Sequence, residues 1–177
     1  MYILRKVISV IFSLILYIPA LSCIESSKSW EILPTEKEIF DTRLEQILYA
    51  LENEDKVGLK NLFSTYILEL TDVDLDSGVE NIMAFFQGEI ISYEAVYQPS
   101  SRETIDSGER EKWIDGYATV KTNKGDFFIY IIEQTLSTQD ESRVGLYLLQ
   151  IMLTDDNSKF LSNYETMGIV VPSDLLS

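Results

Sequence analysis

The chain of 177 residues contains no histidine and a single cysteine, Cys23. The absence of histidine excludes Ser-His-Asp and Cys-His catalysis and every histidine-ligated metal site. A single cysteine excludes a disulfide within the chain. Only 14 Lys and Arg residues stand against 29 Asp and Glu, a net charge of −15, whereas nucleic-acid binders need a basic face. We therefore expect no cofactor, no metal, no nucleic-acid partner and, since no catalytic motif is present, no enzymatic activity.

The N-terminus has the pattern of a secretory signal peptide. Arg5 and Lys6 precede a run from 7 to 18 that is apolar except for two serines, and small residues lead to Ser22 and Cys23. A basic stretch, an apolar core of about 7–15 residues and a small-residue exit define such a peptide. The apolar run is shorter than the roughly 20 residues of a comfortable transmembrane span. We predict cleavage before Cys23.

The residues Ala20-Leu21-Ser22-Cys23 resemble a lipobox, the bacterial signal for attaching lipid to cysteine. The resemblance implies a diacylglyceryl group on Cys23, and two acyl chains are needed for stable anchoring. Plain secretion after an ordinary signal-peptidase cut, or an uncleaved anchor, are the alternatives. We expect a signal peptide at 1–22, a lipid-anchored tether at 23–33 and one domain at 34–177. Its place is then the extracytoplasmic face of the cell membrane, held there by Cys23.

Hydrophobic spacing predicts helices in the first half of the domain and strands in the second. Thr35 and Glu38 form a capping-box pattern, and Ser77 and Glu80 repeat it. The predicted helices run from Thr35 to Asn53, from Lys56 to Leu68, and from Ser77 to Gly88. The predicted strands are Glu89–Tyr97, Trp113–Thr122, Asp126–Thr135 and Arg143–Leu153.

The predicted strands are joined by one long polar segment and one tight turn. The polar segment 98–112 is expected to be a loop, and Asn123-Lys124-Gly125 to be a hairpin turn. The continuous apolar run from 127 to 132 indicates a central strand covered on both faces. Helices followed by consecutive strands indicate an α+β fold, with three N-terminal helices packed on an antiparallel sheet of about four strands.

Aromatic residues on the predicted strands are the candidate binding residues. Tyrosine and tryptophan combine apolar area with a polar tip, which suits binding surfaces, although such residues also serve ordinary cross-strand packing. The candidates on the strands most central to the sheet are Trp113, Tyr117, Tyr130 and Tyr147. The carboxylates Glu94, Asp115 and Glu133 also fall within strands, where one pointing into a cavity could act as a base.

Four segments resemble a family of Gram-positive lipoproteins that carry domain of unknown function 5104. They are Ala50–Asp55, Phe85–Tyr93, Val144–Tyr147 and Gly168–Pro172. The resemblance implies a nuclear transport factor 2-like fold, in which a curved sheet wraps around helices to form a cone. The family has no established activity, so the resemblance implies no catalytic residues.

These observations predict a membrane-anchored, non-catalytic module that binds a small ligand or an envelope protein. One alternative is an enzyme that acts on a small molecule in the cone with strand carboxylates such as Asp115 or Glu133. Another is a structural accessory subunit of an envelope assembly. An open apolar cavity would favour ligand binding, and an exposed apolar patch would favour a protein partner.

Overall fold

The first helix begins where its capping pattern predicts. In the computed structural model of the chain, which describes residues 34–70, 73–95, 100–154 and 166–170, α2 spans Glu36–Glu52. The Thr35 hydroxyl accepts from the Glu38 amide at 3.2 Å, and the Glu38 carboxylate accepts from the Thr35 amide at 2.7 Å. Both capping-box bonds are therefore present, and the predicted start is confirmed. The predicted signal peptide, Cys23 and the tether lie outside the described residues.

Three shorter helices follow α2, so the predicted total of three helices is wrong for the described chain. They are α3 (Lys56–Lys60), α4 (Thr65–Leu68) and α5 (Leu75–Phe85), and a 3₁₀ turn, η1, spans Glu141–Arg143. None of the helices in this part of the chain is long and apolar enough to cross a membrane.

The helix predicted over 56–68 is divided by a contact with a distant strand. Phe63 forms a parallel bridge with Leu146. The Ser64 amide donates to the Leu146 carbonyl at 3.2 Å, and the Leu146 amide donates to the Leu62 carbonyl at 3.0 Å. Local spacing does not reveal a backbone pairing of this kind.

The third predicted helix starts earlier than expected, because the Asp74 carboxylate, rather than Ser77, caps it.

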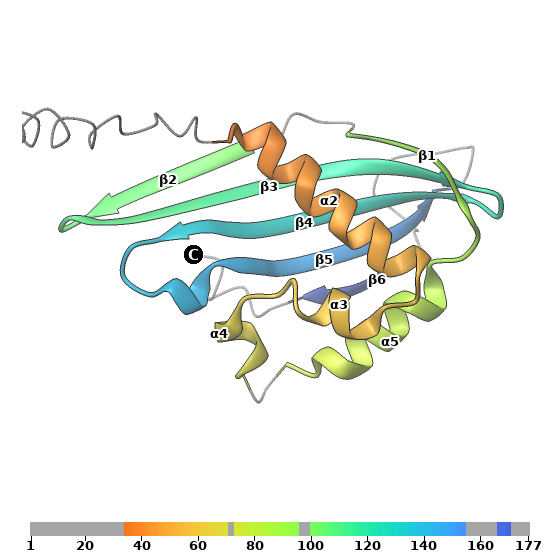
Figure 1. Cartoon of the computed structure of the whole chain (residues 1–177), viewed down its shortest axis with the longest axis horizontal. Coiled ribbons are helices and arrows are strands. Elements are labelled where there is room, and N and C mark those ends of the chain that lie inside the picture. The colour runs from red at the N-terminus through yellow and green to blue at the C-terminus, as the bar shows by residue number, and fades with distance from the viewer. Residues whose placement is uncertain (1–33, 71–72, 96–99, 155–165, 171–177) are drawn as a thin grey trace, which may run out of the picture. The chain divides into compact units, whose positions relative to one another are not determined.

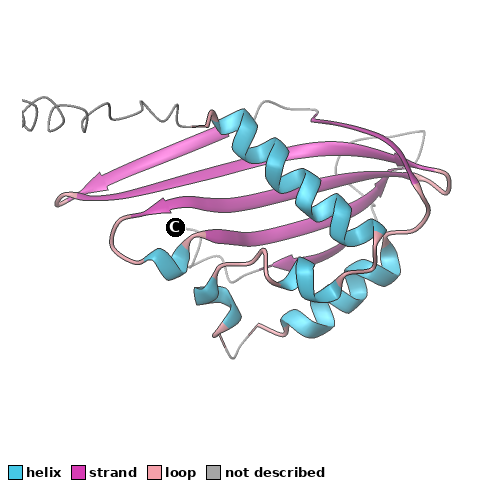
Figure 2. Cartoon of the chain, viewed as in Figure 1, coloured by secondary structure: helices cyan, strands magenta, loops and turns pink. Residues whose placement is uncertain are grey.

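The helices pack on an antiparallel sheet, which confirms the α+β class. The described strands number six rather than the expected four, in the order β1-β3-β4-β5-β6, with β2 also paired to β3. Their bounds are β1 (Ile90–Ala95), β2 (Ser100–Asp106), β3 (Glu109–Thr122), β4 (Asp126–Ser137), β5 (Gly145–Thr154) and β6 (Thr166–Val170). Figure 2 shows the helices in cyan and the strands of this sheet in magenta.

The segment 98–112, expected to be a loop, instead contributes β2 and the start of β3. Ser107 and Gly108 both have positive φ, 49° and 91°, as a tight two-residue hairpin turn requires. Every residue of β2 is exposed. The strand therefore lacks the alternation of apolar and polar residues by which half-buried strands are recognised.

The predicted turn at Asn123 to Gly125 is confirmed, because Thr122 donates its amide to the Gly125 carbonyl.

One face of the sheet carries the core. Residues paired across neighbouring strands lie on the same face, and the pair Gly116 and Ile131 faces α2. A Cβ on Gly116 would lie 2.5 Å from a ring carbon of Phe40, so α2 approaches β3 closely at this point. Helix α5 covers the same face, since the centre of its Phe85 ring lies 6.0 Å from the centre of the Phe127 ring. Figure 1 shows α2 running diagonally across the sheet.

Strand β4 lies at the centre of the sheet, as predicted, but its two faces are not equally covered. Residues on the helix side, such as Ile129 and Ile131, are fully buried. Within the run 127–132, the residues on the opposite side, Phe128, Tyr130 and Ile132, are only partly buried. The expectation that both faces of this run are covered is therefore met fully on the helix side alone. All described residues belong to one compact unit, residues 34–177.

Candidate functional site

The sheet face opposite α2 gathers the four aromatic candidates into two contacting pairs. Strand register pairs Tyr117 directly with Tyr130. Trp113 lies on the same side of β3 as Tyr117, because side chains two apart on a strand share a face. The ring of Tyr147, from β5, lies 4.7 Å from the Trp113 ring. The structure therefore brings the four candidate residues into two aromatic contacts.

Trp113 and Tyr147 form the inner pair and are buried, at 7% and 1% exposure. Their rings meet edge to face, an arrangement that aromatic quadrupoles favour. The Tyr147 hydroxyl donates to the buried Gln134 side chain at 3.2 Å, and the Arg102 guanidinium lies 5.5 Å from the centre of the Trp113 ring. Burial of this degree favours packing over direct ligand contact for both residues.

Tyr117 and Tyr130 form the outer pair, and this pair reaches solvent. The two rings are stacked at 4.5 Å with 20° between their planes. Tyr117 is 39% exposed, whereas Tyr130 is partly buried. Burial, followed by the negative charge of Asp115, raises the pKa of the Tyr130 phenol to about 12. Tyr130 therefore stays neutral and able to donate a hydrogen bond at physiological pH.

Polar side chains surround the outer pair. Asp115 lies on the same side of β3 and accepts from the Ser100 hydroxyl at 2.6 Å. Thr119 follows on the same strand, and Gln150 pairs with Tyr130 from β5. We call this surface the tyrosine face and define it by Asp115, Tyr117, Thr119, Tyr130, Ile132 and Gln150. It combines a flat apolar centre with hydrogen-bonding groups at its margin, which is the composition of many binding surfaces.

The candidate carboxylates do not converge. Asp115 lies on the tyrosine face, whereas Glu133 pairs with Ile114 on the side that faces α2. Glu133 is held there by Arg43, whose Nε and Nη2 donate to its two oxygens at 3.0 and 2.5 Å. Glu94 is exposed on β1. A two-carboxylate arrangement for acid–base chemistry cannot be built from Asp115 and Glu133, because the sheet separates them. In the described part of the chain, no three His, Cys, Asp or Glu side chains could together hold a metal ion.

Sequence reasoning missed the contributions of Ser100 and Arg102 to this surface. Both lie on β2, in the segment that was expected to be a loop, and they pair with Asp115 and Trp113. The Ser107-Gly108 dipeptide was the available signal, since such pairs mark turns between strands. With that turn assigned, the antiparallel register would have placed Arg102 opposite Trp113.

Comparison with known proteins gives the chain a family but no activity. Among curated proteins, none matches the chain. Residues 46–155 match the family described as domain of unknown function (DUF5104). That match covers more than half of the chain, and it includes α3, α4, α5, both aromatic pairs and most of the sheet. The resemblance drawn from the sequence is thus confirmed at the level of the family, and the chain belongs to the DUF5104 family.

Proposed function

We propose that this chain is a lipid-anchored lipoprotein on the extracytoplasmic face of the cell membrane, and that its domain is a non-catalytic binding module. In this proposal the lipid is attached to Cys23. The ligand, either a small molecule or an envelope protein, binds on the tyrosine face. The observation that carries the proposal is the stacked pair of Tyr117 and Tyr130, which leaves a large aromatic ring 39% exposed on an otherwise ordered strand.

An exposed ring held in one orientation suits recognition for a physical reason. Aromatic side chains offer a large contact area while losing few rotatable bonds on binding. Stacking against Tyr130 fixes the Tyr117 ring before any ligand arrives, so less conformational entropy is lost on association. Asp115 and Gln150 add polar contacts at the margin of the pair, and such contacts orient a ligand.

A nuclear transport factor 2-like fold is part of the proposal. The order of the chain, with helices first and an antiparallel sheet after them, is consistent with that fold. So is the passage of α2 across one face of the sheet, as drawn in Figure 1. In this arrangement α2 and α5 occupy one face of the sheet, and the tyrosine face lies on the other.

The hydrogen bonds that hold Glu133 favour a binding module over the enzymatic alternative. This buried carboxylate is held by one guanidinium through both of its oxygens, so it serves as a structural partner of Arg43. Asp115, on the tyrosine face, is hydrogen-bonded by the Ser100 hydroxyl, and Glu94 is exposed on β1 opposite Thr119. If the domain were a structural accessory subunit, its protein partner would bind the tyrosine face. The thermal-shift screen described next therefore also tests that alternative.

A thermal-shift screen tests the binding module directly. Wild type and Tyr117→Ala are each mixed with envelope lipids, peptides and wall fragments. A ligand at 100 times its Kd should stabilise the wild type by about 2.7 kcal/mol, and Tyr117→Ala should lose this stabilisation. Tyr49→Ala is the matched control, because Tyr49 is an exposed tyrosine on α2, outside the tyrosine face. A ligand that stabilises wild type and Tyr117→Ala equally would place its site elsewhere.

The inner pair provides the contrast needed to interpret that screen. Trp113→Ala and Tyr147→Ala should each lower the free energy of unfolding by about 3–5 kcal/mol, because both rings are buried. Tyr117→Ala should lose only the stacking contribution, about 0.5–1.5 kcal/mol. If Tyr117→Ala destabilised the fold as much as Trp113→Ala, the outer pair would be part of the core and the proposed site would be wrong.

The anchor has its own test. Mass spectrometry of the mature N-terminus should find a diacylglyceryl group on Cys23, and Cys23→Ala should leave the membrane fraction. An unmodified thiol on Cys23 in the mature protein would contradict the lipoprotein assignment while leaving the binding module untouched.

A further inference from the structure

A second aromatic surface lies along the solvent side of α2, on the face of the sheet opposite to the tyrosine face. Glu45, Tyr49 and Glu52 recur at three- and four-residue spacing, so they project from one side of the helix. Tyr49 is 65% exposed. Beside α2, strand β1 adds Ile91 and Tyr93, both of which are also exposed. We call these five residues the α2 ridge.

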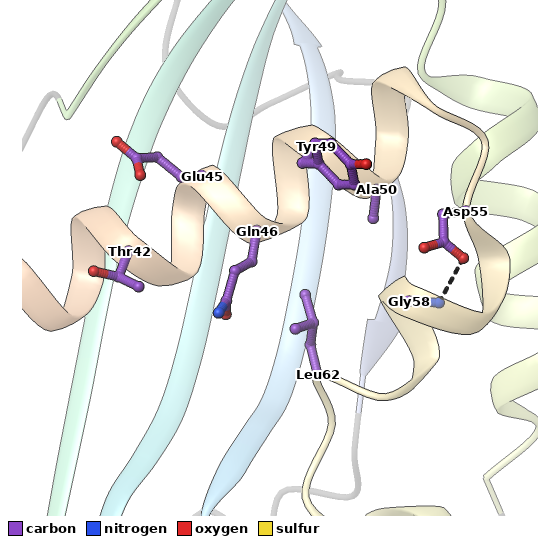
Figure 3. A pocket seen from close by; sticks show the side chains of 8 residues that line it. All are labelled: Thr42, Glu45, Gln46, Tyr49, Ala50, Asp55, Gly58 and Leu62. Carbon is purple, nitrogen blue, oxygen red and sulfur yellow. Dashed lines mark hydrogen bonds between the residues drawn. The ribbon is translucent and has the colours of Figure 1, made fainter.

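Tyr49 stands between two hollows. One, of about 450 Å³, lies between α2 and α3 and is closed below by Leu62. Figure 3 shows Gln46 and Ala50 pointing from α2 toward Leu62, and Asp55 at the far end, where it caps α3 through Gly58. This hollow offers apolar carbon at its floor and polar groups at its margin.

The second hollow, of about 530 Å³, lies between α2 and β1. Leu48 and Ile90 supply its apolar wall, and the Tyr93 hydroxyl donates to Glu45 across it at 3.4 Å. Glu45 and Tyr49 line both hollows. An extended or helical segment crossing the α2 ridge would therefore place side chains on either side of the Tyr49 ring.

The charge of this surface is of one sign. Three carboxylates, those of Glu45, Glu52 and Asp55, line the hollows, and neither hollow is lined by lysine or arginine. Within the described ranges, no lysine or arginine forms an ion pair with Glu45 or Glu52. The whole chain carries a net charge of −15, and such a field attracts cationic partners from a distance.

We propose that the α2 ridge is a docking site for a basic amphipathic peptide segment of a partner protein. The lysine or arginine groups of that segment bind Glu45 and Glu52 and lie over the rings of Tyr49 and Tyr93. Cations are attracted to aromatic faces within about 6 Å of the ring centre. The apolar side chains of the segment enter the two hollows. This site is separate from the tyrosine face and does not depend on the function proposed for it.

Charge argues against the other occupants of such a surface. A second copy of the chain in a two-fold dimer would bring the same patch against itself, so the carboxylates of Glu45 and Glu52 would be placed near those of the other copy. Anionic lipid headgroups would be repelled by the same carboxylates. A basic segment is the partner that offsets the charge and also fills the apolar hollows.

The test measures binding of labelled synthetic peptides to the whole chain, kept in a nonionic detergent, by fluorescence anisotropy. The probes are a short lysine–leucine peptide, a lysine–serine peptide of equal charge and a glutamate–leucine peptide of equal apolarity. At physiological ionic strength the lysine–leucine peptide should bind at least about fivefold more tightly than the lysine–serine peptide, from burial of its leucines. The glutamate–leucine peptide should not bind.

Matched variants locate the site. Glu45→Gln with Glu52→Gln, and separately Tyr49→Ala, should each weaken binding of the lysine–leucine peptide about fivefold, given the usual strength of exposed ion pairs and cation–ring contacts. Glu69→Gln with Glu141→Gln removes the same charge from exposed positions elsewhere. That variant, and Tyr117→Ala on the tyrosine face, should change the affinity by less than about twofold.

Two results would overturn the proposal. One is an absence of binding by the lysine–leucine peptide to the wild-type chain. The other is equal weakening by the two double glutamine variants, which would show that the overall negative charge, rather than the α2 ridge, attracts the peptide. Because Tyr117→Ala serves as a control in this test and Tyr49→Ala in the ligand screen, failure at one surface is distinguishable from failure at the other.

Discussion

Replacing Arg43 with methionine should strongly destabilise the fold, because the change strands a buried negative charge. Glu133 is 3% exposed and receives two hydrogen bonds from the Arg43 guanidinium. Methionine keeps the apolar stem of the arginine but supplies no donor. Breaking one side of a buried ion pair typically costs about 3–5 kcal/mol. That is a large part of the roughly 5–15 kcal/mol by which domains of this size are stable.

The reverse change should cost less, because the two partners are not equally buried. The Arg43 side chain is 19% exposed, and its Nη1 also donates to Gln46 at 3.0 Å. In Glu133→Met the guanidinium can therefore turn toward water, and the loss should be about 1.5–3 kcal/mol, the usual contribution of hydrogen bonds to a charged group. The double variant should regain most of the stability, since apolar replacements of buried pairs are often neutral.

Urea unfolding followed by circular dichroism measures all four proteins. A common dependence of the unfolding free energy on urea concentration would show that the same structure is being lost in each. If Arg43→Met lowered the free energy of unfolding by less than about 1 kcal/mol, Glu133 would have to reach water or another partner. The assignment of Glu133 as a held structural carboxylate would then be wrong, and its use as a catalytic base would regain support.

Two further predictions follow from α2. Gly116→Ala should lower the unfolding free energy by about 1–3 kcal/mol, because its new Cβ would press on the Phe40 ring; Gly125→Ala, which meets only the end of a flexible leucine, is the control in thermal melts. Hydrogen bonds from Thr35 lower the pKa of Glu38, so this carboxylate stabilises the fold above its unfolded pKa of about 4.3 and ceases to do so as pH falls through its lower folded value. Stability measured against pH should therefore fall less steeply on the acid side in Glu38→Gln than in wild type, and identical slopes would contradict the capping assignment.

Features set by neighbouring residues were predictable from the sequence. The capping box at Thr35 and Glu38 involves residues three apart, and the turn at 123–125 joins two adjacent strands. The register of that hairpin was not predictable to the residue. A turn of three residues, as predicted, would pair Thr122 with Asp126 and Tyr117 with Ile131, whereas the observed bond from Thr122 to Gly125 places Tyr117 opposite Tyr130.

Features set by distant contacts were not predictable in the same way. The break between α3 and α4 depends on pairing of Phe63 with Leu146, which lie on opposite sides of the chain's midpoint. The bond between Arg43 and Glu133 depends on which sheet face α2 covers. Strand β2 was not predicted for a different reason. A strand with both faces exposed to water has no apolar pattern to recognise.

The hairpin formed by β2 and β3 has a consequence for the kinetics of local opening. Strands β1 and β2 share one edge of β3, β1 at its end near Thr122 and β2 at its beginning. Separating β2 from β3 breaks a single ladder of seven residue pairs and uncovers little apolar area, because β2 is exposed throughout. Amide protons of β2 should therefore exchange with solvent through brief local separation. Those near Ala118, between β1 and β4, should exchange only when the core itself unfolds. One continuous strand thus spans two regions whose protection from solvent is set by different events.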